Sequence, residues 1–191
     1  MQHFYHGIHG WFNFQPLYQE TIDNATHGQH FVEVGAWKGK SSAFMAVEII
    51  NSNKNIEFDI IDTWEGSSDE TGHMEDPDVI DNTLFETFCS NLSPVQDYIN
   101  VVRSDSVEAA GLYEDESVDF VLLDGGHSYE QVKADITAWL PKVKKGGILA
   151  GDDYGHVDKR HLPKSGLAKA VDELLPNANT DNYWWTYKKE E

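Results

Sequence analysis

The sequence predicts an α/β fold: a doubly wound, mostly parallel sheet with helices on both faces. Two observations lead to this prediction. Short runs rich in β-branched and aromatic residues alternate along the chain with segments of helical periodicity, as in right-handed βαβ crossovers. These runs are strongly apolar and bounded by polar residues and glycines, which is typical of parallel strands covered on both faces. With 191 residues, the chain suits one domain, residues 1–191.

Five runs of strand length are expected to form the parallel part of the sheet: 31–34, 57–62, 99–102, 118–124 and 147–151. A further run within 182–187 has strand composition, and we expect it to form the last edge strand. The segment before it, 177–181, is short. We therefore expect a sheet abbreviated at its C-terminal edge, with residues 177–191 as edge strand and tail.

Helices are expected between the strands, at 17–25, 41–50, 130–140 and 166–175. Pro141 and the pair Gly146-Gly147 separate the third of these helices from the fifth strand, and Pro176 ends the last. The core of the domain then spans 31–176, after a lead-in of residues 1–30. An acidic, turn-rich stretch, 65–82, follows the second strand and is either a surface excursion or a lid over a site.

Composition limits the classes of partner. The formal net charge of −19 disfavours binding to nucleic acid or to an anionic membrane surface. No run of about 18 apolar residues predicts a membrane span, and the N-terminus lacks the pattern of a signal peptide, so a cytoplasmic location is expected. The single cysteine, Cys89, excludes an intrachain disulfide and lies in an apolar helical context that predicts a packed thiol. The sequence leaves a homo-oligomer open.

The first strand joins the first core helix through Glu33-Val34-Gly35-Ala36-Trp37-Lys38-Gly39-Lys40-Ser41-Ser42. Its glycines allow a sharp turn and a close approach to a ligand, and Glu33 could bind a cationic or hydroxyl-bearing group. Asp62, at the end of the second strand, stands where nucleotide-binding sheets hold ribose hydroxyls. Two of the three glycines of a nicotinamide fingerprint are missing, which counts against an NAD-dependent oxidoreductase. An ordinary strand–turn–helix junction is the other interpretation of this loop.

Three acids follow neighbouring strands: Asp124 ends the fourth, and Asp152 and Asp153 follow the fifth. Parallel strands lie about 4.8 Å apart, so these carboxylates should meet at one rim of the sheet. Their repulsion needs a proton, a basic partner or a divalent cation, and oxygen ligands suit Mg²⁺ or another hard ion. The other interpretation has these acids capping helices or solvated at the strand ends.

His127 lies three residues after Asp124, at the same rim. The near-neutral pKa of a histidine suits a general base. Alternatively, His127 orders the loop or caps the helix that begins near Tyr129. Asp124 itself could be the base if no metal binds.

The run Asp-Gly-x-His-x-Tyr-x-x-Val-x-x-Asp at 124–135, followed by Gly146-Gly147 and Asp-Asp-Tyr at 152–154, resembles one branch of class I S-adenosylmethionine-dependent methyltransferases. This branch contains the macrocin-type sugar O-methyltransferases and the cephalosporin-hydroxylase-like proteins. The pattern Glu-x-Gly-x-x-x-Gly at 33–39 resembles motif I of class I. The resemblance covers about 31–176 and implies a Rossmann-like methyltransferase sheet.

The resemblance implies a role for each matched position. The first loop passes the methionine part of the cofactor, the second-strand acid holds the ribose, and residues after the third strand contact the adenine. The implied cofactor-binding residues are Glu33, Gly35, Ala36, Gly39, Ser41, Asp62, Thr63, Asp105, Ser106 and Asp124. A helix cap is the alternative role of Asp105. The metal ligands carried over by position are Asp124, Asp152 and Asp153, with Asp124 and His127 as catalytic candidates.

The function expected from this resemblance is metal-assisted O-methylation of a small-molecule or sugar hydroxyl. A non-catalytic protein of methyltransferase fold is the alternative, and an NAD-dependent oxidoreductase is a weaker one. A nucleic-acid methyltransferase would show an Asn/Asp-Pro-Pro-Tyr/Phe pattern where this chain has 124–127. Acceptor recognition is expected from 1–30, 65–82 and 155–165, which includes His156 and His161.

Overall fold

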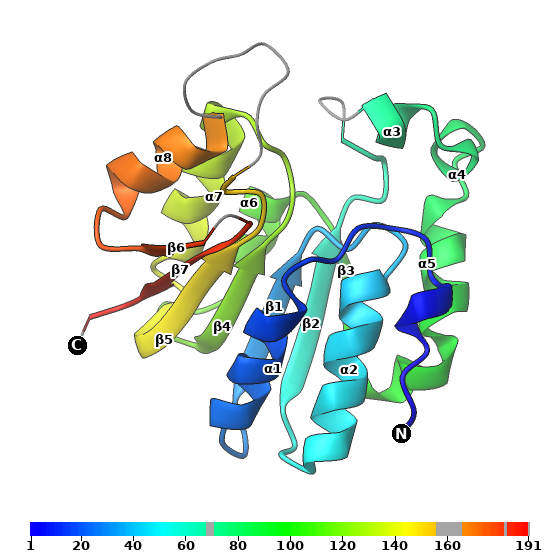
Figure 1. Ribbon diagram of the computed structural model, residues 1–191, viewed down its shortest axis with the longest axis horizontal. Helices are drawn as coiled ribbons and strands as arrows, with labels where there is room; N and C mark the ends of the chain where they lie inside the picture. The colour runs from blue at the N-terminus through cyan, green and yellow to red at the C-terminus, as the bar shows by residue number, and fades with distance from the viewer. Residues whose placement is uncertain (68–70, 156–165, 182, 191) are drawn as a thin grey trace.

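The protein forms a seven-stranded sheet flanked by helices, seen in a computed structural model (Figure 1). The structure describes residues 1–67, 71–155, 166–181 and 183–190. The strands lie in the order β3-β2-β1-β4-β5-β7-β6. Their bounds are β1 His30–Val34, β2 Glu57–Asp62, β3 Asn100–Arg103, β4 Val118–Leu123, β5 Val143–Gly151, β6 Asn179–Thr180 and β7 Trp185–Lys188.

Strands β1 to β5 are parallel, and β7 runs antiparallel to both of its neighbours. From β1 the chain winds outward to β2 and β3, then returns to place β4 and β5 on the other side of β1. The winding direction therefore reverses between β1 and β4, where open α/β sheets form a ligand crevice at the carboxyl ends of the strands. The expected doubly wound α/β fold is confirmed.

The strands at the C-terminal edge of the sheet are short, yet they bring the total in the described residues to seven. β6 has two residues and β7 has four. The sequence predicted no strand in 177–181, but Asn179 pairs with Thr186 and Thr180 with Trp185. Two residues are too few to produce an alternating pattern, which explains why the sequence did not reveal β6.

Helices cover both faces of the sheet (Figure 1). One face carries α1 (Gln15–Asn24), α2 (Lys40–Ser52) and α5 (Leu84–Leu92), and the other carries α6 (Ser106–Ala110), α7 (Tyr129–Trp139) and α8 (Gly166–Leu174). The expected helices match α1, α2, α7 and α8 to within two residues at each end. Shorter helical segments are η1 (Tyr5–Gly7), α3 (Thr71–Met74), α4 (Pro77–Ile80) and η2 (Ser93–Tyr98).

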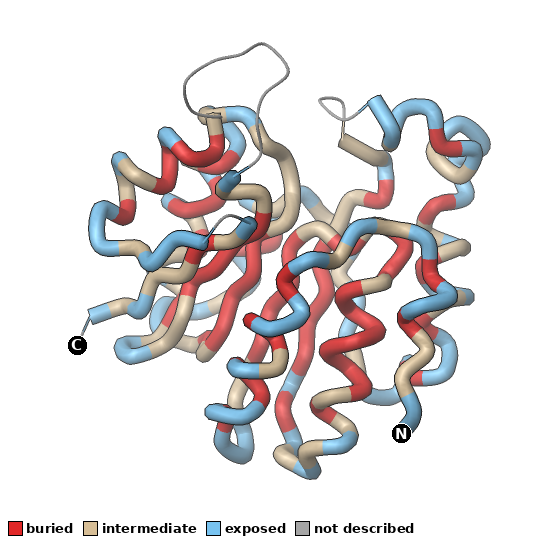
Figure 2. The backbone as a smooth tube through the Cα atoms, in the orientation of Figure 1, coloured by how far each residue is buried: buried red, intermediate tan, exposed pale blue. Residues whose placement is uncertain are grey.

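The sheet separates two apolar cores. In β1 the adjacent residues Phe31 and Val32 belong to different cores, and so do Phe120 and Val121 in β4. Side chains of a strand alternate between the faces, so a continuous apolar run serves both cores at once. The central strands are accordingly buried along most of their length (Figure 2).

Two details differ from the sequence expectations. β5 begins at Val143 rather than at 147, and the register with β4 shifts between Val118 and Phe120. Cys89 is exposed, so the expected packed thiol is wrong: α5 turns this residue away from its buried face of Leu84, Phe88 and Leu92. None of the described helices has the length and apolar character required to cross a membrane.

Candidate active site

A cavity of about 710 Å³ opens at the carboxyl ends of the parallel strands. Its size lies within the usual range for small-molecule sites, about 300–1,000 Å³. Its walls come from the loops that follow β1, β2, β3, β4 and β5, and from the lead-in. The site residues predicted from the sequence that line it are Gly35, Ala36, Ser41, Asp62, Thr63, Asp105, Ser106, Asp124, His127, Asp152 and Asp153.

Gly35 marks the place where the loops after β1 and β4 touch. Its φ is +89°, and a Cβ at this position would lie 1.9 Å from the carbonyl oxygen of Asp124. The Asp124 N–H in turn donates to the Val34 carbonyl at 2.7 Å. Only glycine suits this conformation and this contact, so Gly35 brings the β1 loop against the acidic loop after β4.

Asp62 holds the β1 loop from the other side. Its Oδ2 accepts hydrogen bonds from the backbone N–H groups of Ala36 (2.7 Å) and Trp37 (2.9 Å), and its Oδ1 accepts one from Trp64 N–H (2.8 Å). A carboxylate has about four acceptor directions, so about one remains for a ligand. Asp62 and its neighbour Thr63 line the cavity, where the sequence predicted a ribose contact.

Glu33 and Gly39 lie outside the described lining of the cavity, although the sequence assigned both to the cofactor. Glu33 is wholly buried, and its Oε1 accepts hydrogen bonds from the hydroxyls of Ser41 (2.5 Å) and Ser42 (3.1 Å). A Cβ on Gly39 would lie 2.1 Å from Leu92 Cδ2. The geometry therefore favours an indirect role for both: Glu33 fixes the start of α2, and Gly39 allows close packing against α5.

Burial changes the ionisation of Glu33. Loss of solvent raises the pKa of this carboxyl to about 7, against the opposing effect of the hydroxyls of Ser41, Ser42 and Tyr18. The charge of Asp62 also raises it. The Glu33 carboxyl therefore holds a proton at higher pH than an exposed glutamate does.

Asp105 has the capping role that the sequence left open. Its Oδ1 accepts hydrogen bonds from Val107 N–H (2.9 Å) and Glu108 N–H (3.4 Å) at the start of α6. Ser106 follows it, and its hydroxyl accepts a hydrogen bond from Trp139 Nε1 at 3.0 Å. Both residues also line the cavity, so the cap does not remove them from the adenine position that the resemblance implies.

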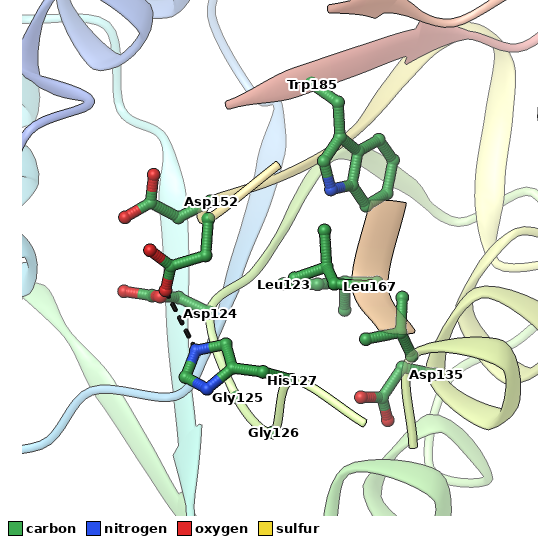
Figure 3. Close-up of a pocket in the computed structure, with 11 residues that line it drawn as sticks. Leu123, Asp124, Gly125, Gly126, His127, Asp135, Asp152, Leu167 and Trp185 are labelled. Carbon is green, nitrogen blue, oxygen red and sulfur yellow. Dashed lines mark ion pairs between the residues drawn. The ribbon is translucent and has the colours of Figure 1, made fainter. Parts of the chain in front are cut away.

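The three acids expected at one rim do meet. Asp124, Asp152 and Asp153 each offer an oxygen, and these oxygens all lie within 4.8 Å of one another. Figure 3 shows the carboxylates of Asp124 and Asp152 beside each other, near His127. Asp152 is buried, and its Oδ1 has no hydrogen-bond partner in the described part of the chain. Asp153 adopts a φ of +60°, an uncommon conformation for a non-glycine residue, as part of this turn.

This cluster is costly to charge fully. Burial, followed by the charges of Asp152 and Asp153, raises the pKa of Asp124 well above its ordinary value. Burial and the charge of Asp153 raise the pKa of Asp152 to about 7, against a lowering effect of His127. A bound cation would offset the repulsion, so the arrangement suits a hard divalent metal.

His127 joins the same cluster. Its Nε2 lies 2.8 Å from Asp153 Oδ2 (Figure 3). The helix that follows is capped by Ser128, whose hydroxyl accepts a hydrogen bond from Gln131 N–H at 3.3 Å. The capping role considered for His127 thus belongs to its neighbour, and the imidazole faces the acids.

The sequence predicted that the lead-in and the 65–82 stretch contribute to the site, but it did not identify which of their residues line the cavity. Gly10, Trp11 and Asn13 of the lead-in line the cavity, as do Gly66, Ser67 and His73 of the stretch expected as a lid. The His73 ring stacks on the Trp37 ring, with centroids 4.0 Å apart, and its centroid lies 5.6 Å from that of the Trp11 ring. The lead-in, the β1 loop and the 65–82 stretch therefore meet there. His156 and His161 lie outside the described residues.

A family model described as a methyltransferase domain matches residues 32–154, more than half of the chain. The chain belongs to this methyltransferase family. The class expected from the motifs, an S-adenosylmethionine-dependent methyltransferase of class I, is confirmed, and an NAD-dependent oxidoreductase is no longer a competing interpretation.

One sequence relative of this methyltransferase is distant. Over 151 residues it is 24% identical to uncharacterized protein y4gI of Sinorhizobium fredii (strain NBRC 101917 / NGR234), a match that covers 79% of the chain. The chain spans 16% of the length of that relative. The similarity is therefore confined to one part of that relative.

Solved structures show the same methyltransferase fold. The O-methyltransferase NovP is similar with a TM-score of 0.66 and 19% identity, over 94% of this chain and 78% of that one. The Podospora anserina methyltransferase PaMTH1, solved bound to S-adenosylhomocysteine, is similar with a TM-score of 0.62 and 13% identity, over 92% and 76% of the two chains. At these identities the likeness concerns the fold.

Proposed function

We propose that this methyltransferase transfers the methyl group of S-adenosylmethionine to a hydroxyl oxygen of a small molecule or a sugar, with the assistance of a divalent cation such as Mg²⁺. One observation carries the proposal: Asp124, Asp152 and Asp153 bring oxygens within 4.8 Å of one another at a wall of the cavity. Clustered acids have no evident role in a protein that only binds a nucleoside.

The cavity suits the cofactor in size and charge. Its many carboxylates favour a sulfonium cation, and the loops after β1, β2 and β3 converge on it. In this proposal Asp62 and Thr63 hold the ribose, and Asp105 and Ser106 lie beside the adenine. The β1 loop and Asp124 flank the methionine part, with contacts from Gly35, Ala36 and Ser41.

The acidic cluster suits a hard cation on three grounds: all its ligand atoms are oxygens, Asp152 Oδ1 is buried without a partner among the described residues, and mutual repulsion raises the pKa values of two members. When bound, such an ion lowers the pKa of a coordinated hydroxyl group. The three carboxylates would also fix where the acceptor hydroxyl lies relative to the cofactor.

His127 would receive the proton. Asp153 orients the imidazole through the 2.8 Å contact at Nε2, which places the ring beside the acidic cluster. In the reaction a C–O bond forms as the S–C bond breaks, and the sulfur retains the electron pair. The products are the methyl ether and S-adenosylhomocysteine, and the hydroxyl proton leaves on the imidazole.

Calorimetry with S-adenosylmethionine and S-adenosylhomocysteine, each with and without Mg²⁺, tests the binding part of the proposal. We expect both ligands to bind and a separate heat for Mg²⁺ that is lost in D153N. Binding of neither ligand would reject the proposed function. Transfer of a labelled methyl group to a panel of uncharged polyhydroxy compounds then tests catalysis, with His127→Gln expected to lower the rate about 100-fold or more while cofactor binding is retained.

A further inference from the structure

The charges that line the cavity are very uneven. Seven carboxylates face it: Asp62, Asp105, Asp124, Glu130, Asp135, Asp152 and Asp153. Among the described lining residues, Lys40 is the one lysine or arginine. Among the described residues, Lys40 is therefore the one side chain of fixed positive charge that an anionic ligand can contact. The position of Lys40 indicates where the negative charge of such a ligand would lie.

Lys38 in the loop after β1 and Lys40 at the start of α2 have different surroundings. Lys38 is buried, with its Nζ 2.8 Å from Asp76 Oδ1 and 2.7 Å from Asp78 Oδ2, so its charge is neutralised within the protein. Lys40 forms no ion pair with any described residue, and its Nζ donates one hydrogen bond, to the Gly10 carbonyl at 2.9 Å. Of its three N–H groups, two are available to a ligand.

Lys40 is also held in place. It is half-buried in the first turn of α2, and the Gly10 contact ties its ammonium to the lead-in at the rim of the cavity. The N-cap of α2 is Gly39, with no side chain capping the first turn, so the helix adds positive potential at the same place. A fixed ammonium loses less entropy on binding an anion than a freely rotating one.

The geometry points to Lys40 as the residue that binds the carboxylate of the methionine part of S-adenosylmethionine. This inference rests on the proposed function, because it assumes the cofactor. The cofactor has one anionic group, and Lys40 lies next to Ser41 at the start of α2, directly after the loop assigned to the methionine part. The sulfonium and the amino group, both cationic, are then left to the acidic remainder of the cavity.

A competing explanation is that Lys40 only anchors the lead-in through Gly10. The two explanations differ in how loss of Lys40 would change the affinity for a ligand without the carboxylate. If Lys40 binds the carboxylate, its charge affects S-adenosylmethionine and not decarboxylated S-adenosylmethionine. If Lys40 acts only on the lead-in, both ligands lose affinity alike.

The experiment is calorimetric titration of the wild type, Lys40→Met and Lys40→Arg with S-adenosylmethionine and with its decarboxylated analogue. Methionine keeps much of the apolar stem, and arginine keeps the charge. We expect Lys40→Met to weaken S-adenosylmethionine about tenfold or more, as for a charge-assisted hydrogen bond, and to change the analogue less than about twofold. Lys40→Arg should recover part of the loss.

Lys145→Met is the matched control, because Lys145 is exposed on β5 and its loss changes the net charge equally. Thermal unfolding verifies that each variant is folded. Equal losses for both ligands, or no loss for either, would overturn the inference while leaving the proposed function intact. Failure of the wild type to bind either ligand would instead reject the proposed function, and the inference with it.

Discussion

The backbone N–H of Trp37 donates a hydrogen bond of 2.9 Å to Oδ2 of Asp62, so the acid that ends β2 holds the loop that follows β1. Ala36 N–H shares the same oxygen at 2.7 Å, and the Trp64 indole donates to the Trp37 carbonyl at 3.0 Å. Trp37 and Trp64 both have positive φ, a conformation that the surrounding contacts must maintain. The two walls of the proposed nucleoside site are therefore ordered together.

Replacing Asp62 should affect both stability and ligand binding. Asp62→Ala removes three backbone hydrogen bonds, each worth about 1 kcal/mol, so we expect the free energy of unfolding to fall by about 2–3 kcal/mol. Affinity for S-adenosylhomocysteine should fall about tenfold or more. Urea unfolding and calorimetry measure the two effects, with Asp62→Asn expected between wild type and alanine. An unchanged affinity in Asp62→Ala would reject the ribose role.

Gly35 offers a second test of how the site is built. Gly35→Ala should destabilise the protein by more than about 2 kcal/mol, because the φ of +89° and the contact with the Asp124 carbonyl both oppose a Cβ. Gly125→Ala is the matched control in the loop after β4: its Cβ would meet nothing within 4 Å, and we expect a change below about 1 kcal/mol. Equal urea midpoints for the two variants would contradict this account.

The parts of the site that could be predicted from the sequence are those that depend on strand ends. Asp62, Asp124 and Asp152 each lie at or just after the carboxyl end of a parallel strand, and parallel topology alone brings such positions to one edge. The alternation of strand and helix patterns was sufficient to predict that topology.

The remaining parts depend on contacts between distant segments. Gly39 follows the motif pattern, yet the structure needs a glycine there because Leu92, more than fifty residues later in the sequence, packs against it. Trp11 reaches the cavity from a lead-in without periodicity, so no pattern places it there. Lys38 and Lys40 look alike in the sequence, and only the position of Asp76 shows which of them is neutralised.

The stability of the protein should depend on pH through an ion pair at the amino end of β1, where His30 Nε2 lies 2.9 Å from Asp59 Oδ2. Burial alone would lower the pKa of His30, but the hydrogen bond and charge of Asp59, with Glu57 and Asp119, raise it overall. The charged histidine thus stabilises the fold below its ordinary pKa of 6.5, and this contribution is lost as the pH rises through the raised value.

Asp59 sets the lower pH limit of the stabilisation by this ion pair. Burial alone would raise the pKa of Asp59, but hydrogen bonds from His30, Asn100 and Tyr113 lower it overall, so its contribution is present above 3.8 and lost as the pH falls further. His30→Gln should therefore lower the free energy of unfolding by about 1 kcal/mol at pH 5–6 and by less at pH 8. Urea unfolding at each pH measures this, with exposed His27→Gln as control. A pH-independent difference would contradict the ion pair.

The carboxylate of Asp152 should have opposite effects on the melting temperature with and without metal. In metal-free protein, at a pH above the Asp152 pKa of about 7, Asp152→Asn removes one of three repelling carboxylates, so the melting temperature should rise by a few degrees, about 2–4 °C per kcal/mol of repulsion removed. Mg²⁺ should raise the melting temperature of the wild type, because it binds the folded cluster, and should have little effect on Asp152→Asn.

The control must separate local repulsion from the general acidity of the chain, whose formal net charge is −19. Asp97→Asn removes the same charge from an exposed position in η2. If repulsion among Asp124, Asp152 and Asp153 is the cause, Asp97→Asn should leave the metal-free melting temperature within about 1 °C and retain the response to Mg²⁺. Equal gains in both variants would attribute the effect to net charge. A wild-type melting temperature insensitive to Mg²⁺ would mean that protons and the neighbouring His127 balance the cluster, and metal assistance would then be rejected.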